Sequence, residues 1–165
     1  MDGAAILERL QSRFGAAVVE THAHRGGHTA VVERAAIVDV LRFCRDEAEL
    51  GFDMLSDLTA VDFLKFHGRE DGPRFEVVYH LYSLAHNHRV RLKVRVDEDD
   101  ALVPTAVSLW PIANWLEREV WDMFGIRFDG HPDLRRLLMY EQFVGHPLRK
   151  DYPINRRQPL IGPKI

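Results

Sequence analysis

The clearest pattern in the sequence is a strict alternation over residues 89–97. Val90, Leu92, Val94 and Val96 are apolar, and charged residues stand between and after them: Arg89, Arg91, Lys93, Arg95 and Asp97. A period of two puts the apolar side chains on one face of a β-strand and the charged ones on the other. The apolar face therefore meets a core, as in antiparallel sheets with one solvated face. A cationic row also suits RNA, but no aromatic or Gly-rich binding loop accompanies it.

Other periodic segments predict the remaining elements. Apolar residues recur at helical spacing in three segments, 2–14, 35–50 and 111–124, and each is followed by a glycine stop: Gly15, Gly51 and Gly125. Further strands are predicted at 17–24, 28–33, 52–64, 75–81 and 103–109, with turns at 25–27 and 86–88. This order predicts an α+β fold, in which helices pack on one side of a mostly antiparallel sheet and an extended proline-rich C-terminal arm follows.

Charge and proline content divide the chain near residue 127. From His131 onward there are seven Lys or Arg and three acids, a balance of +4, whereas the preceding 130 residues carry 15 basic and 22 acidic groups, a balance of −7. Five prolines in this last part disfavour long helices and central strands, although one helical turn is predicted over 133–139. We expect an α+β domain over 1–127 and an extended basic arm over 128–165 that lies along the domain or reaches a partner.

Two acidic residues share a stripe on the predicted helix 111–124. Glu119 and Asp122 stand three residues apart beside the apolar face, in one row with Trp115. Like charges at this spacing repel by a few tenths of a kcal/mol, so a basic group should lie against them. The stripe is either a solvated flank balanced by Arg118 or an ion-pair surface for the downstream arginines or a partner.

Histidines offer a metal-site alternative. His22, His24 and His28 lie around a predicted hairpin, and His131 and His146, with Asp133, Glu119 or Asp122, are the residue types of zinc hydrolase sites. Exposed edge residues explain the first group equally well. A histidine held between Gly and Pro is also typical of a tight turn whose imidazole bonds to a nearby backbone group. Asp57 and Asp62 are likewise either a carboxylate pair or partners of nearby arginines.

Cysteine content and hydropathy exclude several classes. The single Cys44 cannot form an internal disulfide or, alone, hold an iron–sulfur cluster that needs four cysteines, and its apolar helical row predicts a core position. A net charge of −3 makes no case for nucleic-acid binding. Asp2 directly follows Met1, with no sign of a signal peptide, and no run approaches the ~20 apolar residues of a membrane span. We expect membrane contact only through partners.

The stretch from Glu117 to Pro153 carries a family resemblance. It contains the run E-R-E-x-x-D-x-x-G-I-x-F-x-G-H-P-D-L-R-R and then G-H-P-L-R-K-D-Y-P, with two copies of Gly-His-Pro, each followed by paired basic residues. This ordered string resembles the signature of the thirty-kilodalton subunit of respiratory complex I, which in bacteria is the C subunit of NADH-quinone oxidoreductase. The earlier segment Leu58–Leu64 is also similar to that family.

The resemblance implies a non-catalytic role. Such a chain is a structural subunit of the hydrophilic arm, on the cytoplasmic side of the inner membrane, with no cofactor of its own. FMN, iron–sulfur clusters and quinone belong to partner subunits, and the complex couples electron transfer from NADH to quinone to proton translocation. The expected partners are the quinone-site and terminal-cluster subunits, and no nucleic acid. Related subunits in hydrogenases and in F420H2- or ferredoxin-linked complexes remain an alternative.

The signature residues are the expected partner interface. They are Glu117, Glu119, Asp122, His131, Pro132, Asp133, Arg135, Arg136, His146, Pro147, Arg149, Lys150 and Asp151. Charge reversal at Arg135 and Arg136 is expected to release the chain from its complex with its own fold intact. Replacing Glu119 or Asp122 by Ala is expected to weaken assembly more than it unfolds the domain.

Overall fold

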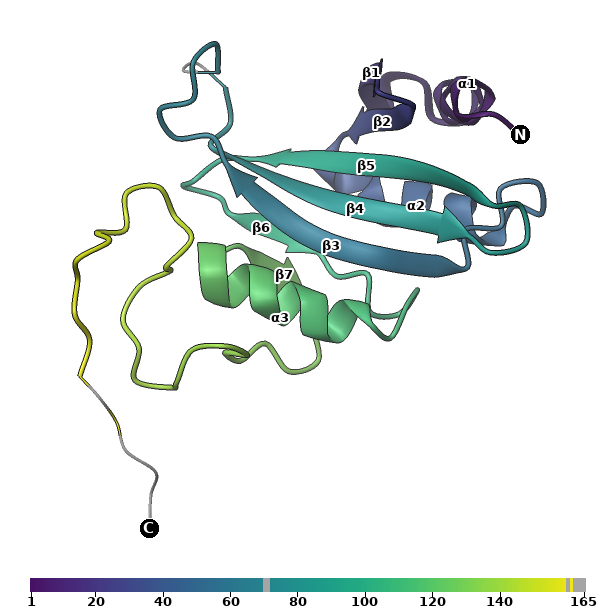
Figure 1. Cartoon of the computed structure of the whole chain (residues 1–165). Helices are drawn as coiled ribbons and strands as arrows, with labels where there is room; N and C mark the ends of the chain where they lie inside the picture. Colours follow the sequence, from purple (N-terminus) through teal and green to yellow (C-terminus); the bar gives the residue numbers. More distant parts are fainter. Residues whose placement is uncertain (70–71, 160, 162–165) are drawn as a thin grey trace.

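The computed structural model describes residues 1–69, 72–159 and 161, and its elements follow the predicted order with three additions, two short 3₁₀ turns and a strand over Arg127–Asp129. The helices are α1 (Gly3–Phe14), α2 (Ile37–Asp46) and α3 (Ala113–Phe124), with short 3₁₀ turns at Gly15–Ala17 and Arg34–Ala36. The strands are β1 (Val18–His24), β2 (Gly27–Val32), β3 (Met54–Asp62), β4 (Phe75–Ser83), β5 (His88–Val96), β6 (Leu102–Pro104) and β7 (Arg127–Asp129) (Figure 1).

Five strands form one sheet in the order β1-β2-β5-β4-β3. Three of its four pairings are antiparallel, and the join between β2 and β5 is parallel. This confirms the predicted α+β class with its mostly antiparallel sheet. The parallel join was not predicted, because periodicity identifies strands but not which strand edges meet. A second, two-stranded parallel sheet pairs β6 with β7, the strands before and after α3.

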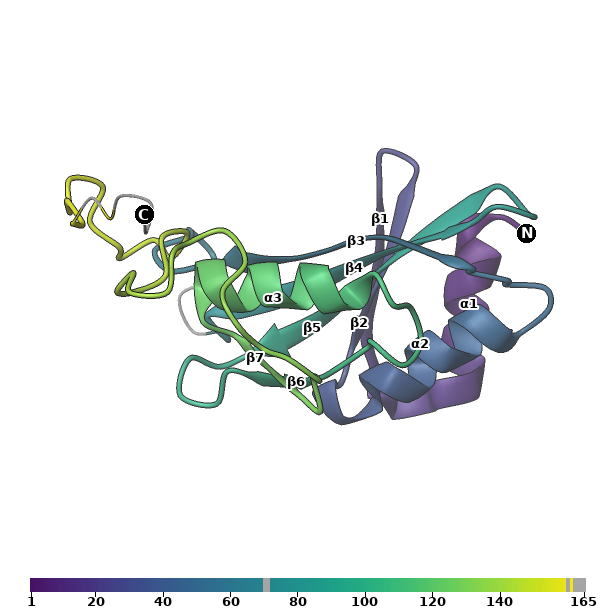
Figure 2. The same cartoon turned by 90° about the horizontal axis from the view of Figure 1, so that it is seen from below.

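One core lies between the helices and the inner face of the sheet. All three helices contribute to it, and so does the apolar row of β5, in which Val90, Leu92, Val94 and Val96 are each at most 3% exposed. Figure 2 shows α3 lying in front of β3 and β4. Cys44 is buried in this core, as predicted. Among the described residues, no helix is long and apolar enough to cross a membrane.

Several boundaries differ from the predictions because local contacts end the elements early. The second helix stops at Asp46, since the next residues turn toward Gly51, whose φ is +52°. The strand predicted over 103–109 ends at Pro104, and turns lead into α3. His88 is not part of a turn: it is the first residue of β5, where its Nε2 bonds to the carbonyl of Leu50 at 2.6 Å.

The segment after β7 has no regular structure. Residues 130–159 form turns and irregular coil, so the helical turn predicted over 133–139 is wrong. The backbone there instead directs consecutive N–H groups at α3, as described below. The division at residue 127 falls within β7, and an arm separate from the domain stays a prediction. Pro163 and Lys164 lie outside the described residues.

Candidate interaction site around helix α3

The centre of the signature is a buried carboxylate, Asp122, on the last turns of α3. It is 0% exposed and accepts four hydrogen bonds. Arg136 Nη1 donates to Oδ1 at 2.5 Å, while the N–H groups of Leu137, Leu138 and Met139 converge on Oδ2 at 3.1, 2.8 and 2.9 Å. Burial works to raise the pKa of Asp122, but these donors outweigh it and hold the pKa below its ordinary value.

Two arginines complete this arrangement by bonding to backbone carbonyls. Arg136, besides its ion pair with Asp122, donates to the carbonyls of Phe143 and Gly145 at 2.8 and 3.2 Å. Arg118 donates to the carbonyls of residues 135 and 136, both at 3.1 Å. Arg118 therefore does not balance the acidic stripe. It holds the chain of the following segment against the helix.

The second Gly-His-Pro motif caps the C-terminal end of α3. The last four carbonyls of the helix each accept one hydrogen bond: Trp121 from Gly125 N at 2.8 Å, Asp122 from His146 Nδ1 at 3.0 Å, Met123 from Leu148 N at 3.1 Å, and Phe124 from Arg149 Nε at 2.6 Å. Helix ends leave such carbonyls unsatisfied, and a cation there also complements the helix dipole. Burial and the nearby arginines lower the pKa of His146, so the imidazole is the neutral, Nδ1-protonated donor.

Gly125 permits this close approach. Its φ is +79°, and a Cβ at this position would lie 2.6 Å from Nε2 of His146. A glycine at the left-handed position after a helix is common. Here the missing side chain of Gly125 also leaves the space that the His146 imidazole occupies. The cap by the second Gly-His-Pro motif therefore requires a glycine at this position.

The first Gly-His-Pro motif is used differently. His131 Nε2 bonds to the carbonyl of Asn114, near the start of α3, at 3.1 Å, and its Nδ1 accepts from the N–H of Asp133 at 3.0 Å. Both ring nitrogens are thus engaged by backbone groups. Asp133 itself is exposed and pairs with Arg135 at 2.8 Å on the surface.

A second ion-pair cluster fastens the segment to the sheet. Asp62, at the end of β3, is buried and pairs with Arg74 at 2.8 Å, and it also accepts the N–H of Lys150 at 2.8 Å. Arg74 reaches Glu98 at 2.6 Å and Asp151 at 2.7 Å as well. Burial works to raise the pKa of Asp62, but Arg74 and the backbone donors hold it low. This confirms the arginine-pairing interpretation of Asp62; Asp57 lies elsewhere, exposed on β3.

Glu117 is the third buried acid of this region and has no cationic partner among its described contacts. It accepts from Thr105 Oγ1 and from the N–H of Ala106, both at 2.6 Å, and so ties the loop after β6 to α3. Burial raises its pKa to about 7, with the two hydrogen bonds acting in the opposite direction. The sequence offered no signal for this state, because burial of one side of a helix depends on the loop packed against it.

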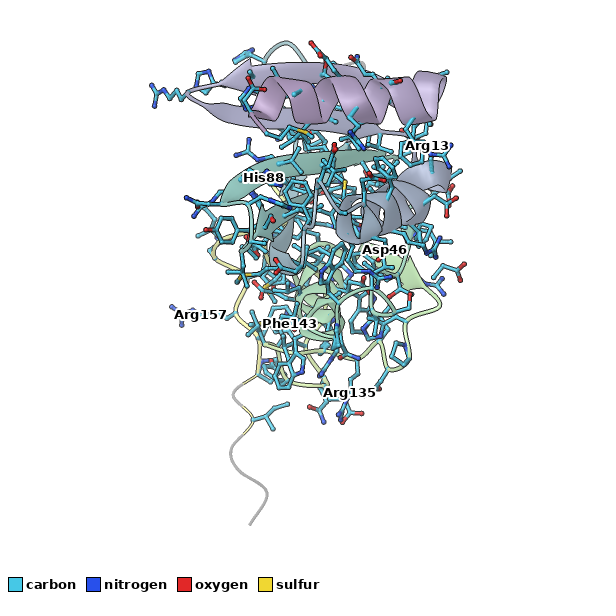
Figure 3. All side chains as sticks on the ribbon, turned by 90° about the vertical axis from the view of Figure 1, so that its right-hand side faces the viewer. Arg13, Asp46, His88, Arg135, Phe143 and Arg157 are labelled. Carbon is cyan, nitrogen blue, oxygen red and sulfur yellow. The ribbon has the colours of Figure 1, made fainter. Side chains whose placement is uncertain are left out.

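Most of the predicted interface residues therefore stabilise the chain's own fold. The structure brings Asp122, Arg136, His146 and Arg149 together around the end of α3. It leaves Glu119, Pro132, Asp133, Arg135 and the Lys150 side chain exposed. Arg135 is 71% exposed and lies on the outside of the segment (Figure 3). Exposed apolar side chains accompany them: Ile112, Trp115, Leu138, Val144 and Leu148.

Two expectations about variants need correction. Reversing the charge of Arg136 is now expected to destabilise the fold, since its side chain is 16% exposed and pairs with a fully buried acid. Asp122→Ala is likewise expected to destabilise the fold as well as assembly, because four donors would lose their acceptor. The expectations for Arg135 and Glu119 stay predictions, as both side chains face solvent.

The metal-site alternatives gain no support. In the described parts of the chain, no three His, Cys, Asp or Glu side chains lie close enough together to hold a metal ion. His131 and His146 point at different ends of α3, and both bond to backbone carbonyls. The structure thus favours the turn-and-cap interpretation of Gly-His-Pro.

Comparison with known proteins agrees with these features. The family model described as "Respiratory-chain NADH dehydrogenase, 30 Kd subunit" matches residues 30–158. The chain is similar to the C subunit of NADH-quinone oxidoreductase from Roseiflexus sp. (strain RS-1), at 49% identity over 96% of this chain and 88% of that protein. It is also similar to the C subunit of the same enzyme from Geobacter sulfurreducens, at 44% identity over 93% of each chain.

Solved structures show the same fold. The trypsin-resistant fragment (1-134) of Nqo5 superposes with a TM-score of 0.71 at 33% identity, over 81% of this chain and all of the fragment. A chain of the membrane-bound sulfane sulfur reductase, an archaeal respiratory membrane complex, gives a TM-score of 0.68 at 26% identity, over 93% of this chain and 86% of that one. With its signature folded around α3 and these relatives along nearly its whole length, the chain belongs to the family of the respiratory-chain NADH dehydrogenase thirty-kilodalton subunit.

Proposed function

We propose that this chain is a structural subunit of the hydrophilic arm of an NADH-quinone oxidoreductase. It binds no cofactor itself and braces the subunits that carry the quinone site and the terminal iron–sulfur cluster. FMN, the clusters and quinone reside in those partners, and the assembly lies on the cytoplasmic side of the inner membrane. The observation that carries this proposal is the family match over residues 30–158, together with relatives named as the C subunit of that enzyme.

The geometry of the signature supports a bracing role. Its buried members anchor residues 130–151 to α3 and to the end of β3, so the surface that they build is held rigidly. In this segment Arg135 and Lys150 are exposed, as is Glu119 on α3, and exposed apolar groups such as Leu138 and Trp115 belong to the same two parts of the chain. Apolar anchors with a charged rim are typical of protein–protein interfaces.

Purification of the complex through a tag on this chain tests the proposal. The expected result is co-purification, at one copy each, with cluster-bearing and quinone-site subunits and with NADH–quinone reductase activity. A double variant, Arg135→Glu with Lys150→Glu, should reduce recovery of those partners at least about tenfold while the melting temperature of the isolated chain stays unchanged. The matched control is Arg13→Glu, an exposed cation on α1 that lies far from Arg135 (Figure 3). Normal recovery and full activity of the double variant would contradict the interface.

A related complex is the second candidate. The fold similarity to a chain of a membrane-bound sulfane sulfur reductase shows that the same architecture occurs in a different respiratory membrane complex. In that case the tagged chain would bring down a complex that does not oxidise NADH. Assaying the purified assembly with NADH as electron donor separates the two candidates.

A further inference from the structure

The outer face of the main sheet, opposite the three helices, consists of two unlike halves. In one half every named cation is paired with a carboxylate. Glu76 is buried there, and Lys93 and Arg69 reach it at 2.9 and 3.0 Å. Arg95 pairs with Glu20 at the edge of the same group. Burial works to raise the pKa of Glu76, but Lys93 and Arg69 hold it low, so this half is a closed ionic network.

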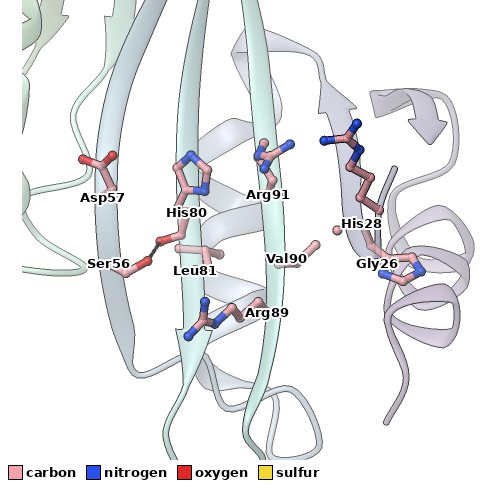
Figure 4. A pocket seen from close by; sticks show the side chains of 11 residues that line it. Gly26, His28, Ser56, Asp57, His80, Leu81, Arg89, Val90 and Arg91 are labelled. Carbon is pink, nitrogen blue, oxygen red and sulfur yellow. Dashed lines mark hydrogen bonds between the residues drawn. The ribbon is translucent and has the colours of Figure 1, made fainter. Parts of the chain in front are cut away.

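The other half carries an excess of positive charge. A concavity of about 490 Å³ lies there, lined by Arg25, Arg89 and Arg91, with Asp57 as its one carboxylate. His80, between Asp57 and Arg91, adds no charge at neutral pH, because burial and then the charge of Arg91 lower its pKa. Three guanidinium groups therefore face one carboxylate. Figure 4 shows Asp57, His80 and Arg91 side by side on neighbouring strands.

The three arginines that line the concavity make only weak contacts with other groups. Arg89 is exposed and lies over the ring of Tyr82, 4.9 Å from its centroid. Arg91 donates to Thr29 at 3.5 Å, a separation well beyond that of a strong hydrogen bond. Arg25 is exposed at the tip of the β1–β2 hairpin, with φ +49°. They contrast with Arg74 and Arg136, which are held by buried carboxylates.

The backbone beside the concavity is also incompletely paired. The parallel ladder between β2 and β5 covers only Thr29–Val31 against Arg91–Lys93. Towards the hairpin tip, residues 27–28 of β2 and residues 88–90 of β5, all within the described part of the chain, lie beyond this ladder. In Figure 4 the hairpin with Gly26 and His28 stands apart from β5 at this level. Unpaired strand edges readily accept a further strand.

We infer that this concavity binds an acidic, extended segment of a neighbouring protein, with its backbone along the unpaired edge of β5 and its carboxylates on Arg25, Arg89 and Arg91. The inference rests on the proposed function, which supplies a neighbouring subunit. Strand addition obtains affinity from main-chain hydrogen bonds and specificity from alternate side chains. The planar guanidinium fork suits carboxylates in two-point contacts. The excess of two positive charges makes an acidic occupant the complementary one.

A peptide experiment tests the chemistry on the isolated full chain. The probe is a fluorescein-labelled octapeptide of alternating Thr and Glu, and binding is measured by fluorescence anisotropy. It should bind at least about tenfold more tightly than the same peptide with Lys in place of Glu. The double variant Arg25→Glu with Arg89→Glu should lose at least about tenfold in affinity, whereas Arg127→Glu, an exposed arginine on β7, should not.

Two further probes separate strand addition from simple anion binding. Methylating alternate backbone nitrogens of the acidic peptide removes its ladder donors and should weaken binding about tenfold. Inorganic phosphate at the same ionic strength should not displace the peptide. Equal binding of the methylated peptide, displacement by phosphate, or no binding at peptide concentrations up to ~1 mM would each overturn the inference.

The assembled complex gives an independent readout. With a photoreactive amino acid in place of Arg25, the expected crosslink joins this chain to one acidic, non-helical segment of a single partner protein. If the complex forms but position 25 crosslinks to no partner, the inference fails while the proposed function stands. If the chain does not co-purify with respiratory subunits at all, it is the proposed function that fails.

Discussion

Helix α3 buries one carboxylate near its middle and another near its end, and their pKa values are shifted in opposite directions. Glu117 and Asp122 are both 0% exposed. Asp122 has a guanidinium and three backbone N–H groups, and its pKa is lowered. Glu117 has one hydroxyl and one N–H, and its pKa is raised to about 7. Two acids on one helix thus differ because of what packs against each.

The comparison shows that burial alone does not decide whether a carboxylate stabilises a fold. An ion removed from water must regain its solvation from partners, and full compensation needs several of them. Residues 136–139 supply four donors to Asp122, whereas the turn at Thr105 and Ala106 supplies two to Glu117. The charge of Asp122 therefore organises the segment after β7, and that of Glu117 destabilises the fold above neutral pH.

The largest effect is expected from Asp122→Ala. It leaves the buried Arg136 and three N–H groups without an acceptor, which should lower the free energy of unfolding by roughly 3–5 kcal/mol. Urea unfolding followed by tryptophan fluorescence measures this. The matched control is Glu119→Ala on the exposed face of the same helix, expected within about 0.5 kcal/mol of the native chain. A loss below ~1 kcal/mol for Asp122→Ala would contradict the assigned role.

Glu117→Gln should remove a pH dependence of the free energy of unfolding rather than a contact. The folded-state pKa is about 7 and the ordinary value is 4.5, so the folded state holds a proton that the unfolded state loses. Stability from this group is present below about pH 4.5 and is lost as pH rises towards about 7. The Gln variant should gain relative to the native chain by up to ~3 kcal/mol between pH 4.5 and 8.

Unfolding curves at several pH values for both chains check this. Asp122 and Asp62, with lowered pKa values, contribute stability that is lost as pH falls, so only the difference between the two chains isolates Glu117. A difference that stays constant with pH would show that folding does not shift the pKa of Glu117.

The two Gly-His-Pro motifs should differ in how much their histidines contribute to the free energy of unfolding. His146→Ala removes the donor to the Asp122 carbonyl at the helix end and should cost roughly 1–3 kcal/mol. His131→Ala, in the half-exposed first motif, should cost only about 0.5–1.5 kcal/mol. Thermal melting of both variants under the same buffer conditions makes the comparison. Equal losses would mean that the cap on α3 adds little beyond an ordinary turn.

The smallest effect on stability should come from Arg135→Glu. The side chain pairs only with exposed Asp133, so the expected change in the free energy of unfolding is within about 0.5 kcal/mol. Arg136→Glu, one residue away, should be mostly unfolded at a temperature at which the Arg135→Glu variant is still folded. Circular dichroism melts of the two variants test this contrast between a surface arginine and a buried one.

Regular elements were predictable where side chains repeat with a clear period. The cap at Asp2, the Gly15 and Gly125 stops and the alternation of β5 depend on neighbours within a few residues, and they agree with the structure. The Gly51 stop does not, because α2 already ends at Asp46. The strand predicted over 103–109 overlaps β6 only at Val103 and Pro104, and β7 was not predicted. Each has three residues, too few for a period, and they are strands only because they pair with each other.

The site residues could likewise be identified from the sequence, but their roles could not. The ordered signature identified the family and marked Asp122, Arg136 and Arg149 as important, but not their roles. Those roles depend on which backbone groups residues 130–151 bring to α3, and that is a matter of packing between distant segments. Arg135 and Arg136 are adjacent and identical in type, yet one faces solvent and the other a buried acid.

Local chemistry in the sequence therefore determined the helices, the longer strands, their inner and outer faces, and membership of the family. Tertiary structure alone decided that β2 joins β5 in parallel, that α3 is capped by a histidine and an arginine more than twenty residues later, and which charges are buried. The reason is physical: periodicity and turn propensities act between near neighbours, whereas the environment of a charge depends on every segment that packs around it.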